Sequence, residues 1–259
     1  MKPPILVTIG IIMMTTTTMT AYAQTTTTAT TNFHYTDISK GFRVQVPSGW
    51  VVDEVNKTDP SVNQRTIPDH GIEFLISMCP QEVSLPAPGR LHTCPFPLPA
   101  TATGAFQLYR FIDLQDRPEL AALVQQGEPI LTDDLLALYI DYQRNLTFYD
   151  PYVYQSIQLA TNEHIEVSIV DPQNNNQTVG AAQAKFVEFT HTDSNGYGSY
   201  KQSALLVLSS DANMGYVVRP LVSQLSNQEL PGFATQVINS FELIAASGPS
   251  EADDEVNLE

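Results

Sequence analysis

One short stretch near the start of the chain constrains its fold more than any other. In residues 41–50, Gly-Phe-Arg-Val-Gln-Val-Pro-Ser-Gly-Trp, apolar and polar side chains alternate with the period of a strand that buries one face. The Pro-Ser-Gly sequence turns the chain, and Trp50, the only tryptophan, follows that turn. We therefore expect a strand that ends in a turn, with Trp50 covering the apolar face that the strand begins.

Apolar segments and helix signals continue along the chain. Residues 72–78 are apolar enough for a central strand, and residues 105–112 resume an extended pattern. Pro118 suits the first turn of a helix, and Thr132 is a candidate N-cap because two aspartates follow it at the positive end of the helix dipole. The helix that Thr132 begins carries one apolar stripe, formed by Leu135, Tyr139, Tyr142 and Leu146.

The second half of the central region is mostly strand. Short links rich in Asn, Asp and Gly leave no room for crossover helices, so antiparallel pairing is expected. A last helix at 231–240, set among mainly antiparallel strands, completes the pattern of an α+β domain. The extended segments are residues 154–159, 163–170, 184–191, 201–208 and 216–222. The predicted core positions are Phe42, Val44, Val46, Trp50, Val237 and Phe241, with Trp50 expected under the face that carries Val237 and Phe241.

Composition and charge limit the classes of partner that this chain could bind. Hydrophobic residues make up 42% of the 259 residues, which is enough for a sizeable core. The chain has 12 basic and 28 acidic residues and a formal net charge of -16, so nucleic acid would be repelled. No cofactor is expected, and weak binding of cations to acidic loops is the remaining alternative.

The N-terminal residues have the pattern of a secretory signal peptide. Lys2 supplies the positive charge, residues 5–14 are apolar, and Ala21-Tyr22-Ala23 forms a cleavage site. The apolar run is short for a bilayer, so we expect no integral span after cleavage, with a retained anchor as the alternative. The expected location is secreted or in the cell envelope. The expected organisation is a signal peptide at 1–23, a threonine-rich tether at 24–32, a folded domain at 33–244 and a disordered acidic tail at 245–259.

Several short motifs across the domain resemble the PsbP-like family. They are residues 41–50, 180–184, 215–218, 230–233 and 239–244. PsbP is an extrinsic lumenal subunit of photosystem II, and its relatives include secreted and lipid-anchored prokaryotic proteins. The resemblance implies a central antiparallel sheet sandwiched between helices and a non-catalytic role in binding or assembly. No motif here matches the metal ligands of the family.

Two cysteines, Cys79 and Cys94, are the only ones in the chain. In an exported protein such a pair predicts a disulfide, which would stabilise the fold by roughly 3 kcal/mol for a loop of this length. The alternative is a metal cluster that adds His92, but it lacks a fourth ligand and close cysteine spacing.

Catalytic motifs are absent from the sequence. The five histidines are His34, His70, His92, His164 and His191, and none belongs to a His-Glu-x-x-His motif or accompanies a Gly-x-Ser-x-Gly elbow. A hydrolase could still assemble from distant residues if His70 or His164 met a carboxylate and a hydroxyl. The carboxylates Asp133, Asp134 and Asp141 are explained by their places on a helix, and residues 193–196 predict a hairpin turn rather than a calcium loop.

Two kinds of surface site are predicted, namely a protein interface and sites of N-glycosylation. Tyr139, Tyr142, Tyr149, Tyr152 and Tyr154 cluster around the end of a predicted helix and are either core or an interface. The sequons begin at Asn56, Asn145 and Asn176, of which Asn176 lies in the most polar loop.

These observations favour an exported, non-catalytic protein that binds another exported or envelope protein. Two alternatives stay open, namely an extracellular hydrolase and a glycosylated structural envelope protein.

Overall fold

The computed structural model describes residues 32–54, 71–87, 90–94, 104–145, 154–193, 199–221 and 232–245. The predicted signal peptide, almost all of the tether and all but the first residue of the acidic tail lie outside these ranges. The candidate residues Asn56, His70, Tyr149 and Tyr152 also lie outside them, as do Leu146 of the predicted apolar stripe and residues 194–196 of the predicted hairpin turn.

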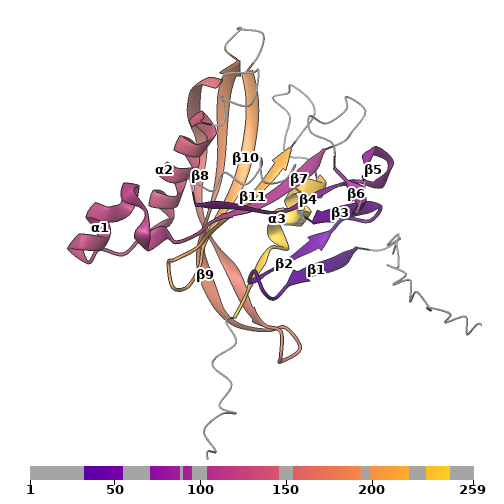
Figure 1. Cartoon of the computed structure of the whole chain (residues 1–259), viewed down its shortest axis with the longest axis horizontal. Helices are drawn as coiled ribbons and strands as arrows, with labels where there is room; N and C mark the ends of the chain where they lie inside the picture. Colours follow the sequence, from indigo (N-terminus) through magenta and orange to yellow (C-terminus); the bar gives the residue numbers. More distant parts are fainter. Residues whose placement is uncertain are drawn as a thin grey trace, which may run out of the picture.

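A single curled sheet of ten strands dominates the described chain (Figure 1), in the order β1-β2-β12-β8-β9-β10-β11-β7-β4-β3. All neighbouring strands pair antiparallel except β12 and β8, which are parallel. The bounds are β1 (Phe33–Asp37), β2 (Phe42–Val46), β3 (Trp50–Glu54), β4 (Ile72–Pro80), β7 (Ala105–Phe111), β8 (Tyr154–Asp171), β9 (Gln177–Asp193), β10 (Ser199–Leu208), β11 (Gly215–Leu221) and β12 (Glu242–Ile244).

Smaller elements fill the connections between these strands. The helices are α1 (Ala121–Gln126), α2 (Thr132–Asn145) and α3 (Gly232–Asn239). Three short 3₁₀ turns are η2 (Gln81–Val83), η3 (Leu114–Asp116) and η4 (Pro118–Leu120), and a separate hairpin consists of β5 (Leu85–Ala87) and β6 (Arg90–Thr93). No helix in the described ranges is both long and apolar enough to cross a membrane.

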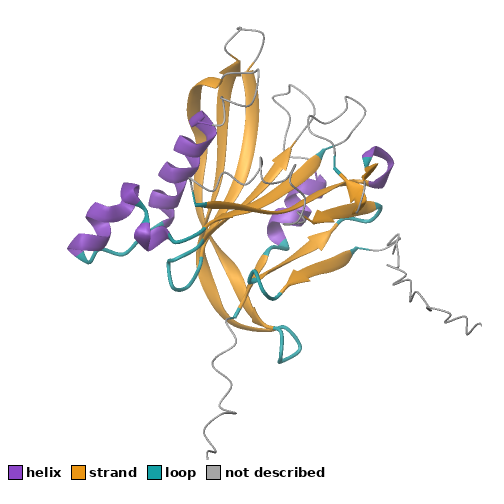
Figure 2. Ribbon diagram, viewed as in Figure 1, coloured by secondary structure: helices purple, strands orange, loops and turns teal. Residues whose placement is uncertain are grey.

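The two faces of the sheet are covered by different helices (Figure 2). One face packs on α3, where Val237 and Phe241 join buried side chains of β2, β7, β10 and β11. The other face packs on α2, whose Leu135 and Tyr139 contact buried residues of β9 and β10. The predicted α+β class, with a mainly antiparallel sheet between helices, is confirmed.

Several strand predictions need correction. The strand expected at 72–78 is an interior strand, since β4 lies between β7 and the edge strand β3, but it extends to Pro80. The two strands predicted at 154–159 and 163–170 form one strand, β8, with a register shift between Leu159 and Thr161 where a break was expected. Strands β1 and β12 were not predicted.

The stretch that opens the domain forms β2, a turn and β3. Phe42, Val44 and Val46 are fully buried, and Gly49 occupies the turn with a positive φ of 75°, which a glycine adopts without strain.

Trp50 is half-buried and packs against the cluster that contains Val237 and Phe241, but its closest aromatic contacts are with other residues. Its ring packs on Phe233 of α3 at 5.1 Å and on Phe106 at 6.0 Å, measured between ring centroids. Phe241 stacks instead on Phe42 at 6.2 Å. The helix therefore presents Phe233, not its last turn, to the tryptophan.

Candidate functional site

A pocket of about 220 Å³ lies where two turns meet the end of the last strand. The turn between β1 and β2 contributes residues 38–41, and the turn between β10 and β11 contributes residues 209–211 and Met214. Leu243 and the residues that follow it close the apolar side. These segments are far apart in the sequence, so the pocket exists only in the folded sheet.

Backbone and side-chain hydrogen bonds hold the first turn in place. The Tyr216 hydroxyl donates to the Lys40 carbonyl oxygen at 2.7 Å, and Arg110 donates to the same oxygen at 3.3 Å. Burial raises the pKa of Tyr216, although the neighbouring Arg110 opposes the shift. Arg110 also pairs with Glu73 at 2.7 Å. Its positive charge is therefore balanced within the protein.

The second turn uses its own polar groups internally. The Ser209 hydroxyl donates to Asp211 at 2.6 Å, and the same carboxylate oxygen accepts from the backbone N–H of Asn213 at 3.1 Å. The Ser209 oxygen accepts from the Met214 N–H at 2.9 Å. The serine and the aspartate thus fix the turn through hydrogen bonds within it.

A second polar feature crosses the sheet face that α2 covers. The strand register places Asp53, Ser77, Gln107 and Arg219 as successive cross-strand partners on β3, β4, β7 and β11. Cross-strand partners point to the same face, so they form one polar row, which is flanked by apolar residues. Asp53, Ser77 and Arg219 are buried. With its amide turned toward Arg219, Gln202 accepts a hydrogen bond from the guanidinium at 2.7 Å.

The described part of the tyrosine cluster lies beside this row and belongs to the core. Tyr139 is fully buried, and Tyr142 packs on Tyr109 with ring centroids 5.5 Å apart. Gln143 donates to the Tyr109 hydroxyl at 3.3 Å. Burial raises the pKa of Tyr109 and of Tyr142, and the positive charge of Arg219 opposes both shifts. The backbone of Tyr154 begins β8.

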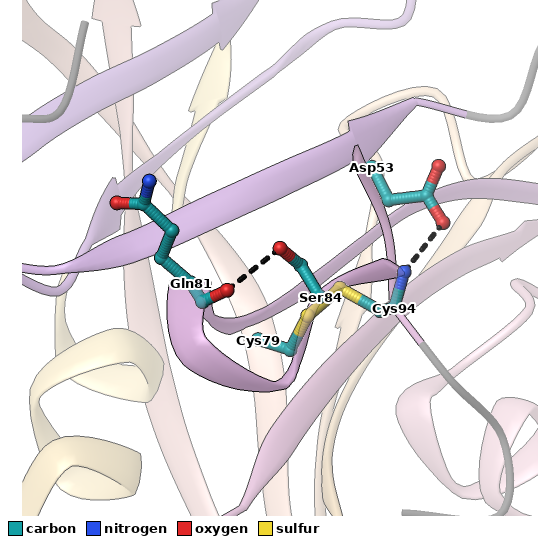
Figure 3. The surroundings of a disulfide bond; sticks show 5 residues. All are labelled: Asp53, Cys79, Gln81, Ser84 and Cys94. Carbon is teal, nitrogen blue, oxygen red and sulfur yellow. Dashed lines mark hydrogen bonds between the residues drawn. A yellow bond between two sulfur atoms is a disulfide. The ribbon is translucent and has the colours of Figure 1, made fainter. Parts of the chain in front are cut away.

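The disulfide joins Cys79 and Cys94 beside the row (Figure 3). The Asp53 carboxylate accepts a hydrogen bond from the Cys94 backbone N–H at 3.1 Å, and the Ser84 hydroxyl donates to the Gln81 carbonyl oxygen at 2.7 Å. Because the cysteines are oxidised, they cannot act as thiolate ligands, which removes the metal cluster with His92. The structure describes only the backbone of His92, in β6.

The predicted acid and base residues are spread over separate elements. His34 is exposed on β1, His164 is exposed on β8, and His191 contributes backbone to β9. Among the described residues, no three His, Cys, Asp or Glu side chains gather as metal ligands would.

The three aspartates of α2 lie along a helix, as the sequence indicated. Asp133 pairs with the buried Lys185 of β9. The Asp134 carboxylate accepts from the Leu131 backbone N–H at 2.8 Å, which caps the helix start. Asp141 is exposed. Thr132 is the first helical residue rather than the cap.

The sequons differ in where they lie. Asn176 is exposed in the turn between β8 and β9, with a positive φ of 56°. Asn145 is the last residue of α2. Glycosylation at either position, and at Asn56, stays a prediction.

Comparison with known proteins relates the fold to solved structures. No family model matches the sequence, and no curated protein matches it. The solution structure of cyanobacterial PsbP (CyanoP) from Synechocystis sp. PCC 6803 is similar with a TM-score of 0.46 and 10% identity, covering 83% of this chain and 93% of that chain. The Ran-binding protein Mog1p of Saccharomyces cerevisiae is similar with a TM-score of 0.40 and 12% identity, covering 83% of this chain and 96% of that chain.

The chain is similar in structure to a PsbP protein over most of its length. Identities this low transfer no function, so the site has to be judged from its own residues.

Sequence reasoning missed both the pocket and the polar row. Lys40 and Tyr216 are 176 positions apart, and Arg110 and Met214 are 104 apart. The spacing of Val51 and Asp53, two positions apart in a strand, is a local signal that a polar side chain shares a face with an apolar neighbour. Its partners Ser77, Gln107 and Arg219 become visible only once the register is known.

Proposed function

We propose that this chain is an exported accessory protein that binds another exported or envelope protein and performs no chemical step. The observation that carries the proposal is that charged side chains form ion pairs that hold the fold together. Several of those that are buried or half-buried fasten one strand to another, as Arg43 on β2 does with Glu242 on β12 at 2.6 Å. Arg110 joins β7 to β4 through Glu73 in the same way. The exposed candidates His34, His164 and Asp141 lie on three separate elements.

Two observations support an extracytoplasmic location. The N-terminal sequence has the pattern of a secretory signal, and the Cys79–Cys94 disulfide is stable in an oxidising compartment. An acidic chain with a net charge of -16 suits a partner that offers basic groups.

Cross-linking in intact cells tests the proposal. The full chain with a small C-terminal tag is expressed in its native host, cross-linked, purified and identified by quantitative mass spectrometry. We expect at least one exported or envelope protein to be enriched over a control in which residues 1–32 direct the same tag without the domain. Recovery of the monomer alone, at several cross-linker lengths, would contradict the proposal.

A further inference from the structure

One long strand of the sheet has a largely open edge. β8 pairs with β9 along its full length, from Tyr154 to Asp171. On its other side, within the ranges that the structure describes, only Ile169 and Val170 are paired, by the short strand β12. The remaining length of this edge carries no partner strand among those residues.

The open part of β8 is accessible to solvent. Gln158, Leu159 and Ala160 are exposed, and Leu159 retains 44% of its accessible surface. Asn162, Glu163, His164 and Glu166 are also exposed. Helix α2 packs on a face of the sheet, where Tyr139 contacts Phe189 of β9.

The strand register limits the part of this edge to which a further strand could pair. The register shifts between Leu159 and Thr161, and bulges at such a shift generally hinder a further strand from pairing. β12 occupies the edge from Ile169 onward. Between them, Thr161–Val167 forms a window of seven continuous residues, a length of about 23 Å. It contains no proline and no lysine, the residues that commonly protect an edge.

An extended polypeptide can add to such an edge by main-chain hydrogen bonds. The precedent within this molecule is β12, which already pairs with the same edge of β8 next to the window. Backbone groups supply affinity in this mode, while side chains beside the edge select the partner.

Charge indicates which partner fits. The window carries Glu163 and Glu166, and residues 154–170 contain no lysine or arginine. Glu163 is the cross-strand partner of Phe186 and Glu166 that of Gln183, so the two carboxylates lie on opposite faces of the strand. A second copy of this chain would bring the same glutamates and a net charge of -16, and would be repelled.

We propose that Thr161–Val167 of β8 binds an extended, basic segment of the partner polypeptide as an added strand. This inference rests on the proposed function, since it names the surface through which the accessory protein binds. Lysine or arginine side chains on both faces of the added strand would approach Glu163 and Glu166.

A synthetic peptide tests the pairing directly. The probe is an eight-residue peptide in which pairs of lysines alternate with pairs of threonines, so that an extended strand carries lysine on both faces. It is added to the full mature chain while amide hydrogen exchange is followed by NMR. We expect slower exchange of outward-facing amides within Thr161–Val167 and an unchanged rate in β4. A peptide with the same charge but N-methylated at alternate residues should give no protection, because it cannot donate the main-chain hydrogen bonds. A peptide with glutamate in place of lysine should also fail.

Charge reversal at the window provides a matched pair of variants. Glu163→Lys with Glu166→Lys should weaken binding of the lysine peptide about tenfold, because two attractive contacts become repulsive. The control, Glu82→Lys with Glu128→Lys, makes the same change in net charge at two exposed positions outside β8, and its affinity should stay within about twofold of the unmodified chain. Circular dichroism confirms that both variants are folded.

Several outcomes would overturn the inference. They are protection outside β8, equal binding of the N-methylated peptide, equal weakening by both double variants, and a dissociation constant above about 1 mM. A concentration-dependent dimer that protects Thr161–Val167 would assign the edge to a second copy instead.

The inference and the proposed function fail separately. If the cross-linked partner is recovered equally with the Glu163→Lys/Glu166→Lys variant, the accessory role stands and the edge is not its surface. If no partner is recovered while the peptide still protects β8, the edge binds strands and the accessory role fails.

Discussion

At the scale of single residues, Lys185 shows how a charge can be kept inside this fold. Its side chain retains 1% of its accessible surface on β9, and its ammonium pairs with Asp133 in the first turn of α2, which stays 60% exposed. A buried ammonium is costly unless it is paired. The aspartate therefore has a structural role that also accounts for an acidic residue at the helix start.

We expect the two partners of this pair to respond differently to substitution. Asp133→Ala should lower the free energy of unfolding by about 1–2 kcal/mol, because it leaves the ammonium buried without its counter-charge, and the exposed position of Asp133 limits the loss. Lys185→Met removes the charge while keeping the shape and should change stability by less than about 1 kcal/mol. Urea denaturation measures both. A larger loss for Lys185→Met than for Asp133→Ala would contradict this account.

Trp50 is a residue whose contacts differ from those that the sequence suggested. Trp50→Ala should lower the free energy of unfolding by about 2–3 kcal/mol, below the range for a fully buried ring, because the side chain is half-exposed and packs mainly on Phe106 and Phe233. Trp50→Phe keeps most of that contact and should cost less than about 1.5 kcal/mol. Chemical denaturation of both variants checks this, and equal losses would show that the indole contacts do not set the cost.

At the scale of elements, the disulfide ties the irregular segment after β4 back to the sheet. Cys79 is fully buried and Cys94 nearly so, and Asp53 holds the Cys94 backbone. Replacing both cysteines by alanine should lower the free energy of unfolding by about 3 kcal/mol, chiefly because the unfolded chain gains freedom over the 15 positions that separate them.

The matched control for that variant is the unmodified chain in reductant, which should lose a similar amount of stability. Alkylation of the denatured protein under non-reducing conditions should label neither cysteine. Labelling of both thiols in protein purified from the host would contradict the disulfide.

How well the sequence predicts an element depends on how local its signal is. The alternation at Phe42, Val44 and Val46 is a property of five consecutive residues, and the strand forms where it was expected. β12 has only three residues and is held by pairing with Arg43, Phe42, Ile169 and Val170. Such a strand has no periodicity of its own that the sequence could reveal.

The candidate sites were harder to predict for the same reason. A pocket between two turns depends on Lys40, Arg110 and Tyr216 meeting across the sheet. The open edge of β8 depends on the order of the strands, which places β12 against only its last residues. Neither follows from hydrophobic patterning, since the register and the strand order are tertiary properties.

At the scale of the whole molecule, buried tyrosines are a titratable group that both hydrophobic cores share. Tyr216 lies in the cluster that α3 covers, and Tyr109 and Tyr142 lie with the cluster that α2 covers. Tyr35 donates to Glu54 at 3.0 Å and packs beside the first cluster. Burial raises the pKa of all four above the ordinary value of 10.0. Folding is therefore coupled to keeping these phenols neutral.

We expect this coupling to unfold the protein at alkaline pH. Below pH 10 the phenols are protonated in both the folded and the unfolded state, so their contribution to the free energy of unfolding does not change with pH. Above pH 10 the unfolded chain releases these protons while the folded chain retains them, so stability falls as pH rises. For Tyr109 and Tyr142, the more deeply buried pair, the loss is about 1.4 kcal/mol per pH unit each until the folded pKa is reached. Tyrosinate absorbance should rise together with the loss of circular dichroism, and Tyr142→Phe should move the midpoint to higher pH because it removes one of the linked protons. Tyrosinate formation well before unfolding would show that the phenols ionise inside the folded sheet, against the burial that the structure gives them.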